Sequence, residues 1–204
     1  ILFQAPTDHP ANRFNDGKCS PDGRIIAGTM DMNEKEPNGQ LYQVKADGSK
    51  TVLRPAVTIS NGLAWNIQKK LFYYIDTPTM TVQCASYDPA TGEVGPFSQF
   101  IHIPQSIGFP DGMTIDSQGN LYIAMWQGHA VTIWDGESGE SRGSISVPAL
   151  NVTCPVFGGE EMDELFITSA RIGMNDEQLK KYPLSGGVFK LKLGLKGIAG
   201  SRFK

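Results

Sequence analysis

Three oxygen-bearing side chains recur at one spacing along this 204-residue sequence. Asn15, Asn61 and Asp111 each precede the start of a short apolar run by ten residues, and a glycine follows each of them directly or after one residue. Amide and carboxylate oxygens suit a hard divalent cation, with Ca²⁺ favoured, Mg²⁺ or Mn²⁺ next, and Zn²⁺ still open although no Cys or His joins the set. If the fold brings these side chains together, they predict a site for one such cation.

A second interpretation applies to each of these positions. Asn-Gly and Asp-Gly are also the commonest hairpin turns, so each pair can serve the backbone instead of a ligand. The position in the first repeat is open as well, because aligning Asp16-Gly17 with the other two pairs would put Asp16 in place of Asn15. One carboxylate is little charge for tight Ca²⁺ binding, and a further acidic ligand is therefore expected from elsewhere.

The elements that must position these side chains can be read from an internal repeat. A turn and a short apolar run recur at intervals of 46, 50 and 44 residues, and the equivalent anchor positions are Ile25, Leu71, Leu121 and Leu165. Each run is followed by a second β-branched or aromatic segment with its own turn, as hairpins require. Repeats near 46–50 residues are typical of β-propeller blades. Equivalent positions of successive blades converge on the central channel of a propeller, so the shared register of the three side chains favours a common site.

The chain is therefore expected to be all-β, a single partial β-propeller domain over residues 1–204 with about four blades. Little sequence precedes the first anchor, and missing N-terminal residues are favoured over a complete four-bladed ring. Only residues 175–182 have a helical pattern: Asn175 or Asp176 can cap this segment, and Pro183 ends it.

Composition excludes several classes of partner. The net charge is −3 and no long Lys/Arg cluster is present, so neither nucleic acid nor a membrane surface is expected as a partner. The 3 cysteines are scattered, which favours a reduced compartment, and the cytoplasm is the expected location. The sequence contains no apolar stretch long enough to span a membrane and begins without a signal-peptide pattern.

Six motifs in order along the chain resemble the senescence marker protein-30/gluconolactonase/luciferin-regenerating enzyme family, which includes the regucalcins. They are Asn12-Arg13-Phe14-Asn15-Asp16-Gly17-Lys18, Ala27-Gly28-Thr29-Met30, Ser60-Asn61-Gly62-Leu63-Ala64-Trp65, Phe72-Tyr73-Tyr74-Ile75-Asp76, Pro110-Asp111-Gly112-Met113-Thr114-Ile115-Asp116 and Gly186-Gly187-Val188-Phe189-Lys190. The resemblance implies a six-bladed β-propeller of which about four blades are present here.

The resemblance also implies a metal-dependent lactonase. Its cation would be held by Asn61, by Asp111 and by a glutamate from an N-terminal Glu-Gly-Pro segment that this sequence lacks. Arg13 and Asn15 match the family's substrate contacts, which favours Asn15 over Asp16. Asn33 stands where the family often has a glutamate, so it would bind substrate hydroxyls without acting as a base. The implied chemistry is hydrolysis of a sugar lactone by water activated at the metal, with Asp111 as a metal ligand that also takes the proton of the water.

Other interpretations stay open beside this one. A Ser/His/Asp nucleophilic site is disfavoured because none of the three histidines has the required motif context, although His129 could reach the channel mouth as a secondary contact. A non-enzymatic calcium-binding protein and a specialised hydrolase of nitriles or organophosphates share the same implied ligands. A monomer is expected, associated with its N-terminal segment if that segment is a separate fragment.

Overall fold

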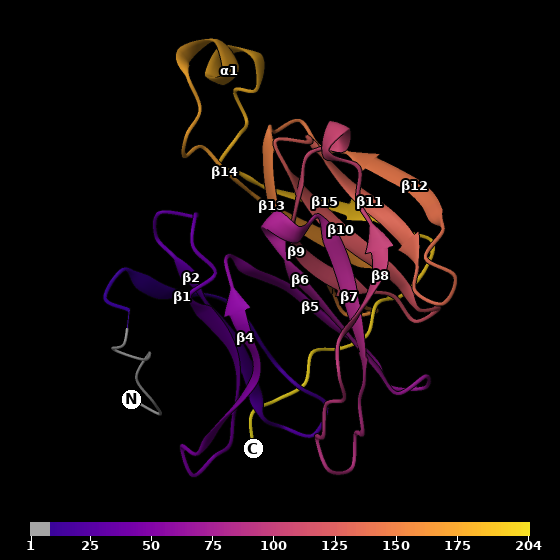
Figure 1. Ribbon diagram of the computed structural model, residues 1–204. Helices are drawn as coiled ribbons and strands as arrows, with labels where there is room; N and C mark the ends of the chain where they lie inside the picture. The colour runs from indigo at the N-terminus through magenta and orange to yellow at the C-terminus, as the bar shows by residue number, and fades with distance from the viewer. Residues whose placement is uncertain (1–8) are drawn as a thin grey trace. The chain divides into compact units, whose positions relative to one another are not determined.

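The computed structural model describes residues 9–204, so the first eight residues of the predicted domain lie outside the described part of the chain. The described residues form two compact units, one running up to Phe100 and including Gly200–Lys204, the other spanning Ile101–Ala199. Strands dominate both units (Figure 1). Among these residues, no helix is both long and apolar enough to cross a membrane.

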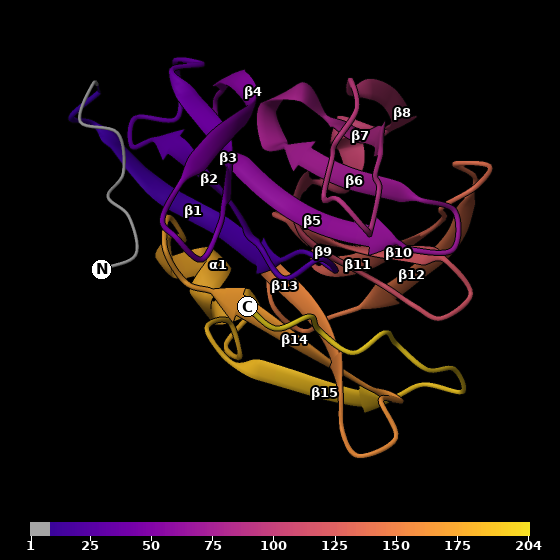
Figure 2. The same ribbon diagram turned by 90° about the horizontal axis from the view of Figure 1, so that it is seen from below.

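The strands form four antiparallel sheets, each of which runs in the order of the chain. The first contains β1 (Asn12–Cys19), β2 (Ile25–Asp31), β3 (Gly39–Val44) and β4 (Lys50–Val57), and the second β5 (Ser60–Asn66), β6 (Leu71–Asp76), β7 (Thr81–Ser86) and β8 (Ser98–His102). The third contains β9 (Phe109–Ile115), β10 (Asn120–Trp126), β11 (Ala130–Asp135) and β12 (Ser141–Ser146). The fourth contains β13 (Asn151–Gly158), β14 (Glu164–Ala170) and β15 (Val188–Lys192), which lie side by side in Figure 2.

This architecture confirms the prediction of an all-β chain with about four propeller blades. Each anchor of the repeat is the first or second residue of the second strand of its sheet, and these residues are Ile25, Leu71, Leu121 and Leu165. The third sheet illustrates why the hairpins form where the turn residues stand. Asp116 accepts hydrogen bonds from the backbone N–H of Gln118 and of Asn120 between β9 and β10, and Gly119 supplies the left-handed backbone of that turn at a φ of 91°.

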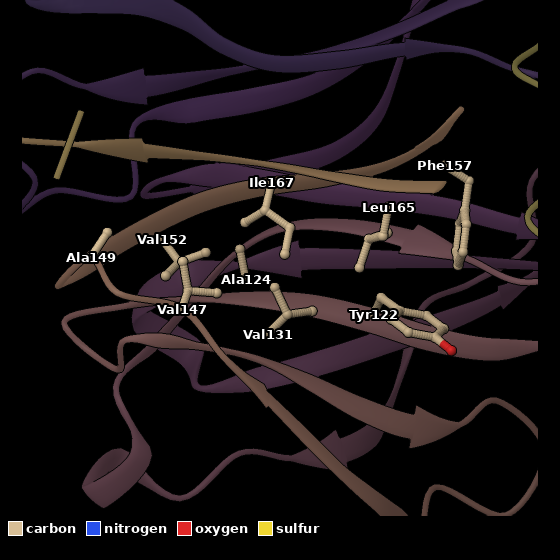
Figure 3. Packing of buried hydrophobic residues seen from close by; sticks show 9 residues of the cluster. All are labelled: Tyr122, Ala124, Val131, Val147, Ala149, Val152, Phe157, Leu165 and Ile167. Carbon is tan, nitrogen blue, oxygen red and sulfur yellow. The ribbon is translucent and has the colours of Figure 1, made fainter. Parts of the chain in front are cut away.

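Each unit has its own apolar core. In the second unit, side chains from β10 and β11 face side chains from β13 and β14, with Tyr122 and Phe157 in edge-to-face contact at 5.1 Å (Figure 3). In the first unit, Trp65 of β5 stacks on Phe72 of β6 at 4.8 Å and packs against Tyr87. Burying each such side chain contributes about 1.5–3 kcal/mol, so these clusters hold the sheets of each unit together.

One short helix, α1 (Asp176–Lys181), lies in the connection between β14 and β15 and stands apart from the sheets of its unit (Figure 1). Asn175 caps its N-terminus: the side-chain oxygen accepts the N–H of Gln178, and Gln178 accepts the N–H of Asn175 in return. The predicted helix over residues 175–182 is confirmed, with Asn175 as its cap.

Candidate functional site

A β-bulge marks the first strand of every sheet. In the first three sheets, the pairing with the second strand shifts where the candidate pairs stand, so that two residues oppose one residue of the partner strand. These pairs are Asn15-Asp16, Asn61-Gly62 and Asp111-Gly112. In the fourth sheet, β13 shifts between Val152 and Cys154. Bulges redirect side chains and are common beside active sites, and the three sequence-predicted positions therefore share a local geometry as well as a spacing.

In the first unit, hydrogen bonds join three of the predicted residues in a chain. Arg13 donates from Nη1 to Oδ1 of Asn15 at 2.8 Å, and Asn15 donates from Nδ2 to Oδ1 of Asn61 at 3.1 Å. Asn15 also donates to the carbonyl oxygen of Ser60 at 2.8 Å. Asn61 in turn donates from Nδ2 to Oγ1 of Thr77 at 2.8 Å. These bonds orient both amides. Oδ1 of Asn61 accepts one hydrogen bond and keeps a second lone pair for a further ligand.

Burial differs along this hydrogen-bonded series of side chains. Asn61 is buried, whereas Arg13 and Asn15 are exposed. A buried amide oxygen held by a neighbouring donor is suited to bind a cation, and exposed polar groups beside it are suited to contact a soluble ligand. The sequence did not point to Ser60 or Thr77, since bonds between a side chain and a distant strand or turn leave no periodic signal.

Gly28 allows the first two sheets to approach each other at this position. It lies opposite the bulge on β1, and a Cβ atom at Gly28 would occupy the place of the Ser60 side chain. Oγ of Ser60 accepts a hydrogen bond from the hydroxyl of buried Tyr74 at 3.0 Å. The missing side chain of Gly28 therefore leaves room for Ser60, whose carbonyl oxygen accepts the hydrogen bond from Asn15.

The bulge also separates the roles of Asn15 and Asp16. Asn15 bonds to Asn61, whereas Oδ1 of Asp16 accepts the N–H of Gly17 at 2.7 Å. Burial raises the pKa of the Asp16 carboxyl, and the charge of Lys18 and the N–H of Gly17 oppose that rise. Of these two residues, Asn15 is therefore the one that contacts Asn61.

Asp111 belongs to the second unit and is half-buried on β9. The glycine after it is required by a close approach: a Cβ at Gly112 would lie 2.7 Å from the carbonyl oxygen of Thr153 and 2.8 Å from Sγ of Cys154. The bulge on β9 is therefore packed directly against β13. This contact fixes the backbone that carries the carboxylate of Asp111.

Two further predicted residues lie on loops. Asn33 is exposed, and both its backbone N–H and its Nδ2 donate to Oδ1 of Asp31, at 3.1 and 3.2 Å. Backbone hydrogen bonds from this loop, led by the N–H of Glu36, lower the pKa of Asp31. His129 is exposed as well, and its ring stacks on that of Tyr182 at 6.1 Å, next to α1.

The donor set can be tested against the predicted cation. Within residues 9–204, no group of three or more His, Cys, Asp or Glu side chains is placed to hold a metal ion. The first unit offers the oriented amide oxygen of Asn61, and the second unit carries the carboxylate of Asp111. Both are hard oxygen donors, so their chemistry fits Ca²⁺, Mg²⁺ or Mn²⁺ better than a thiophilic ion.

Comparisons with known proteins place the chain in a family. Residues 1–171 match the family described as SMP-30/Gluconolactonase/LRE-like region. YvrE of Bacillus subtilis, whose name describes it provisionally as a sugar lactone lactonase, is 41% identical over 192 residues, covering 94% of this chain and 66% of its own. The chain thus spans about two thirds of the length of this relative.

Two solved structures extend the comparison. One is described as regucalcin, a calcium-binding protein, from Agrobacterium tumefaciens; it superposes with a TM-score of 0.94 at 29% identity and covers 100% of this chain and 69% of its own. The other is a luciferin-regenerating enzyme, with a TM-score of 0.88 at 33% identity, covering 97% of this chain and 67% of its own.

Proposed function

Because this chain belongs to the SMP-30/gluconolactonase/LRE-like family, we propose that it forms the larger part of a divalent-metal-dependent lactonase that hydrolyses sugar lactones. The observation that carries the proposal is the hydrogen-bonded series from Arg13 through Asn15 to Asn61. It places the exposed guanidinium of Arg13 and the exposed amide of Asn15 beside the buried, oriented amide oxygen of Asn61. This is the combination that a site for a polar ester substrate and a metal ion needs.

The residues proposed to hold the cation are Asn61 and Asp111, with Ca²⁺ as the first candidate and Mg²⁺, Mn²⁺ or Zn²⁺ as alternatives. When bound, a divalent cation supplies positive charge for the developing oxyanion of an ester carbonyl and lowers the pKa of water. A second acidic ligand is proposed to come from the family's N-terminal glutamate. The name of the Agrobacterium tumefaciens relative as a calcium-binding protein supports the choice of Ca²⁺.

The chain's own side chains are proposed to act directly on the water and the substrate. The carboxylate of Asp111 accepts a proton from the attacking water and returns it to the ring oxygen as the acyl–oxygen bond breaks. The guanidinium of Arg13 and the amide of Asn15 donate to oxygens of the lactone and fix its orientation. Asn33 is proposed as a further contact with sugar hydroxyls, and Asp16 and His129 stay secondary candidates.

The test is hydrolysis of D-glucono-1,5-lactone by the metal-stripped protein, measured again after addition of Ca²⁺, Mg²⁺, Mn²⁺ or Zn²⁺. Turnover should be lost on chelation and restored by at least one of these ions. Turnover that is unchanged by chelation would contradict the metal dependence. A protein that binds Ca²⁺ and hydrolyses no lactone would support the alternative, a calcium-binding protein without enzymatic activity.

A second alternative is a specialised hydrolase, favoured by the likeness to a luciferin-regenerating enzyme. A panel of lactones, nitriles and organophosphates distinguishes it from the lactonase. We further propose that the protein acts as a monomer in the cytoplasm and takes a small-molecule lactone as its partner, with neither nucleic acid nor a membrane among its ligands.

A further inference from the structure

The fourth sheet contains a residue at the bulge position that counting along the sequence does not find. Ten residues before Leu165 stands Pro155, which has no polar side chain. In the structure, β13 shifts its pairing between Val152 and Cys154, and Thr153 is the extra residue. The corresponding shifts on the other first strands hold the predicted residues Asn15, Asn61 and Asp111.

Thr153 borders the bulge that carries Asp111, within the same unit. A Cβ at Gly112 would lie 2.7 Å from the carbonyl oxygen of Thr153 and 2.9 Å from Cα of Cys154. A side chain at position 112 would have no room there, because β9 runs directly against β13 at this point. The backbones of Gly112 and Thr153 are therefore immediate neighbours, and Asp111 is the next residue along β9.

The hydroxyl of Thr153 is held in a fixed pair. Oγ1 of Thr153 lies 2.7 Å from Oγ1 of Thr168 on β14, and Thr168 also donates to the carbonyl oxygen of Cys154 at 3.3 Å. Either hydroxyl can be the donor within the pair, and in both cases each hydroxyl oxygen keeps at least one lone pair that can accept. Thr168 is exposed and Thr153 half-buried, so the pair can be reached from solvent.

We propose that Thr153 and Thr168 form a hydroxyl-binding subsite that selects polyhydroxylated lactones over lactones without ring hydroxyls. Acceptor oxygens pair with the hydroxyl protons of a sugar, whereas a bare methylene ring would leave them without a partner. The proposal rests on the proposed function in one respect: that function makes Asp111, whose bulge the subsite borders, a catalytic residue.

The experiment uses two lactams that cannot be hydrolysed as lactones are and that differ in ring hydroxyls and the hydroxymethyl group: D-glucono-1,5-lactam and δ-valerolactam. Their dissociation constants are measured by calorimetry, with Ca²⁺ present, for the wild type, Thr153→Val and Thr168→Val. Valine keeps the β-branched shape of threonine and removes only the hydroxyl. Thr51→Val, at an exposed position on β4, is the matched control, and Thr153→Ser tests whether the hydroxyl alone restores binding.

The wild type should bind the hydroxylated lactam at least about fivefold more tightly than δ-valerolactam, and either valine variant should lose about that factor for the hydroxylated lactam alone. Thr51→Val and Thr153→Ser should behave as the wild type. Equal binding of the two lactams by the wild type, or an unchanged preference in both valine variants, would overturn the subsite.

Parallel assays of lactone hydrolysis separate this proposal from the proposed function. If the wild type hydrolyses no lactone but its lactam preference depends on Thr153, the subsite stands and the lactonase assignment fails. If lactones are hydrolysed and the preference does not depend on Thr153 or Thr168, the subsite fails and the lactonase assignment stands.

Discussion

The side-chain amide of Asn15 on β1 donates a hydrogen bond to the amide oxygen of Asn61 on β5, 46 residues later, at 3.1 Å. Each residue stands at the β-bulge of its strand. The bond therefore links equivalent positions of two successive sheets, and a proposed substrate contact orients a proposed metal ligand. Substitutions on either side of this bond should change substrate binding more than they change the stability of the fold.

Replacing Asn15 by Ala removes the donor to Asn61 and the acceptor for Arg13. We expect the KM for D-glucono-1,5-lactone to rise about tenfold, because one oriented hydrogen bond is lost on each side. Since Asn15 is exposed, the free energy of unfolding should fall by only about 1 kcal/mol. Kinetics and urea unfolding of the same preparation measure both quantities.

The control for this variant is Asn66→Ala. Asn66 ends β5 and accepts the N–H of Lys69 in an exposed turn. Its replacement should affect stability slightly and KM not at all. Equal kinetic effects of the two variants would show that Asn15 has no special role.

Gly28→Ala tests the close approach between Gly28 and Ser60. The added Cβ would occupy the place of the Ser60 side chain, and overpacking of this kind costs about 1–3 kcal/mol of unfolding free energy. Ser60→Gly removes that side chain, but it also deprives Tyr74 of its hydrogen-bond acceptor. The double variant should therefore lose less stability than the sum of the two single variants, as measured by urea unfolding. Additive losses would show that the two positions do not share the space.

Asp16→Asn tests a stability contribution that depends on pH. Burial raises the pKa of Asp16 above 3.8 in the folded protein, so the folded state holds the proton more tightly than the unfolded state. At low pH Asp16 is protonated in both states, and its burial then costs no free energy of ionisation. As pH rises from the unfolded pKa through the folded pKa, the buried carboxylate lowers the free energy of unfolding. We expect the Asn variant to unfold at a higher urea concentration than the wild type at pH 7, and the difference to shrink below pH 4. A wild type that is the more stable protein at pH 7 would refute this prediction.

The repeat could be predicted from sequence because blade hairpins place turn residues and apolar runs in a regular order. The anchors Leu71 and Leu121 do stand at the start of second strands, and the helix capped by Asn175 forms where predicted. The choice between Asn15 and Asp16 was open on spacing alone, since a bulge places two residues opposite one. In the structure, Asn15 bonds to Asn61, whereas Asp16 accepts the N–H of Gly17.

Thr153 could not be found by counting, because the distance from a bulge to the next strand depends on hairpin length. Asn66 pairs with Leu71 across the hairpin in the second sheet, whereas Phe157 pairs with Leu165 in the fourth. The longer hairpin moves the bulge away from Pro155. Contacts such as that between Asn61 and Thr77 likewise depend on tertiary packing and leave no sequence pattern.

The central claim is that Asp111 holds a cation on which turnover depends and accepts the proton of the attacking water. Its most direct test is to measure Ca²⁺ binding by calorimetry and lactone turnover on the same metal-stripped samples of the wild type and of Asp111→Asn. Asparagine keeps the shape of the side chain and removes its charge and basicity. We expect the wild type to bind about one Ca²⁺ and the variant to lose Ca²⁺ affinity together with at least about a hundredfold of kcat. Full turnover in the variant, or lactone hydrolysis by a wild type that binds no divalent ion, would contradict the account.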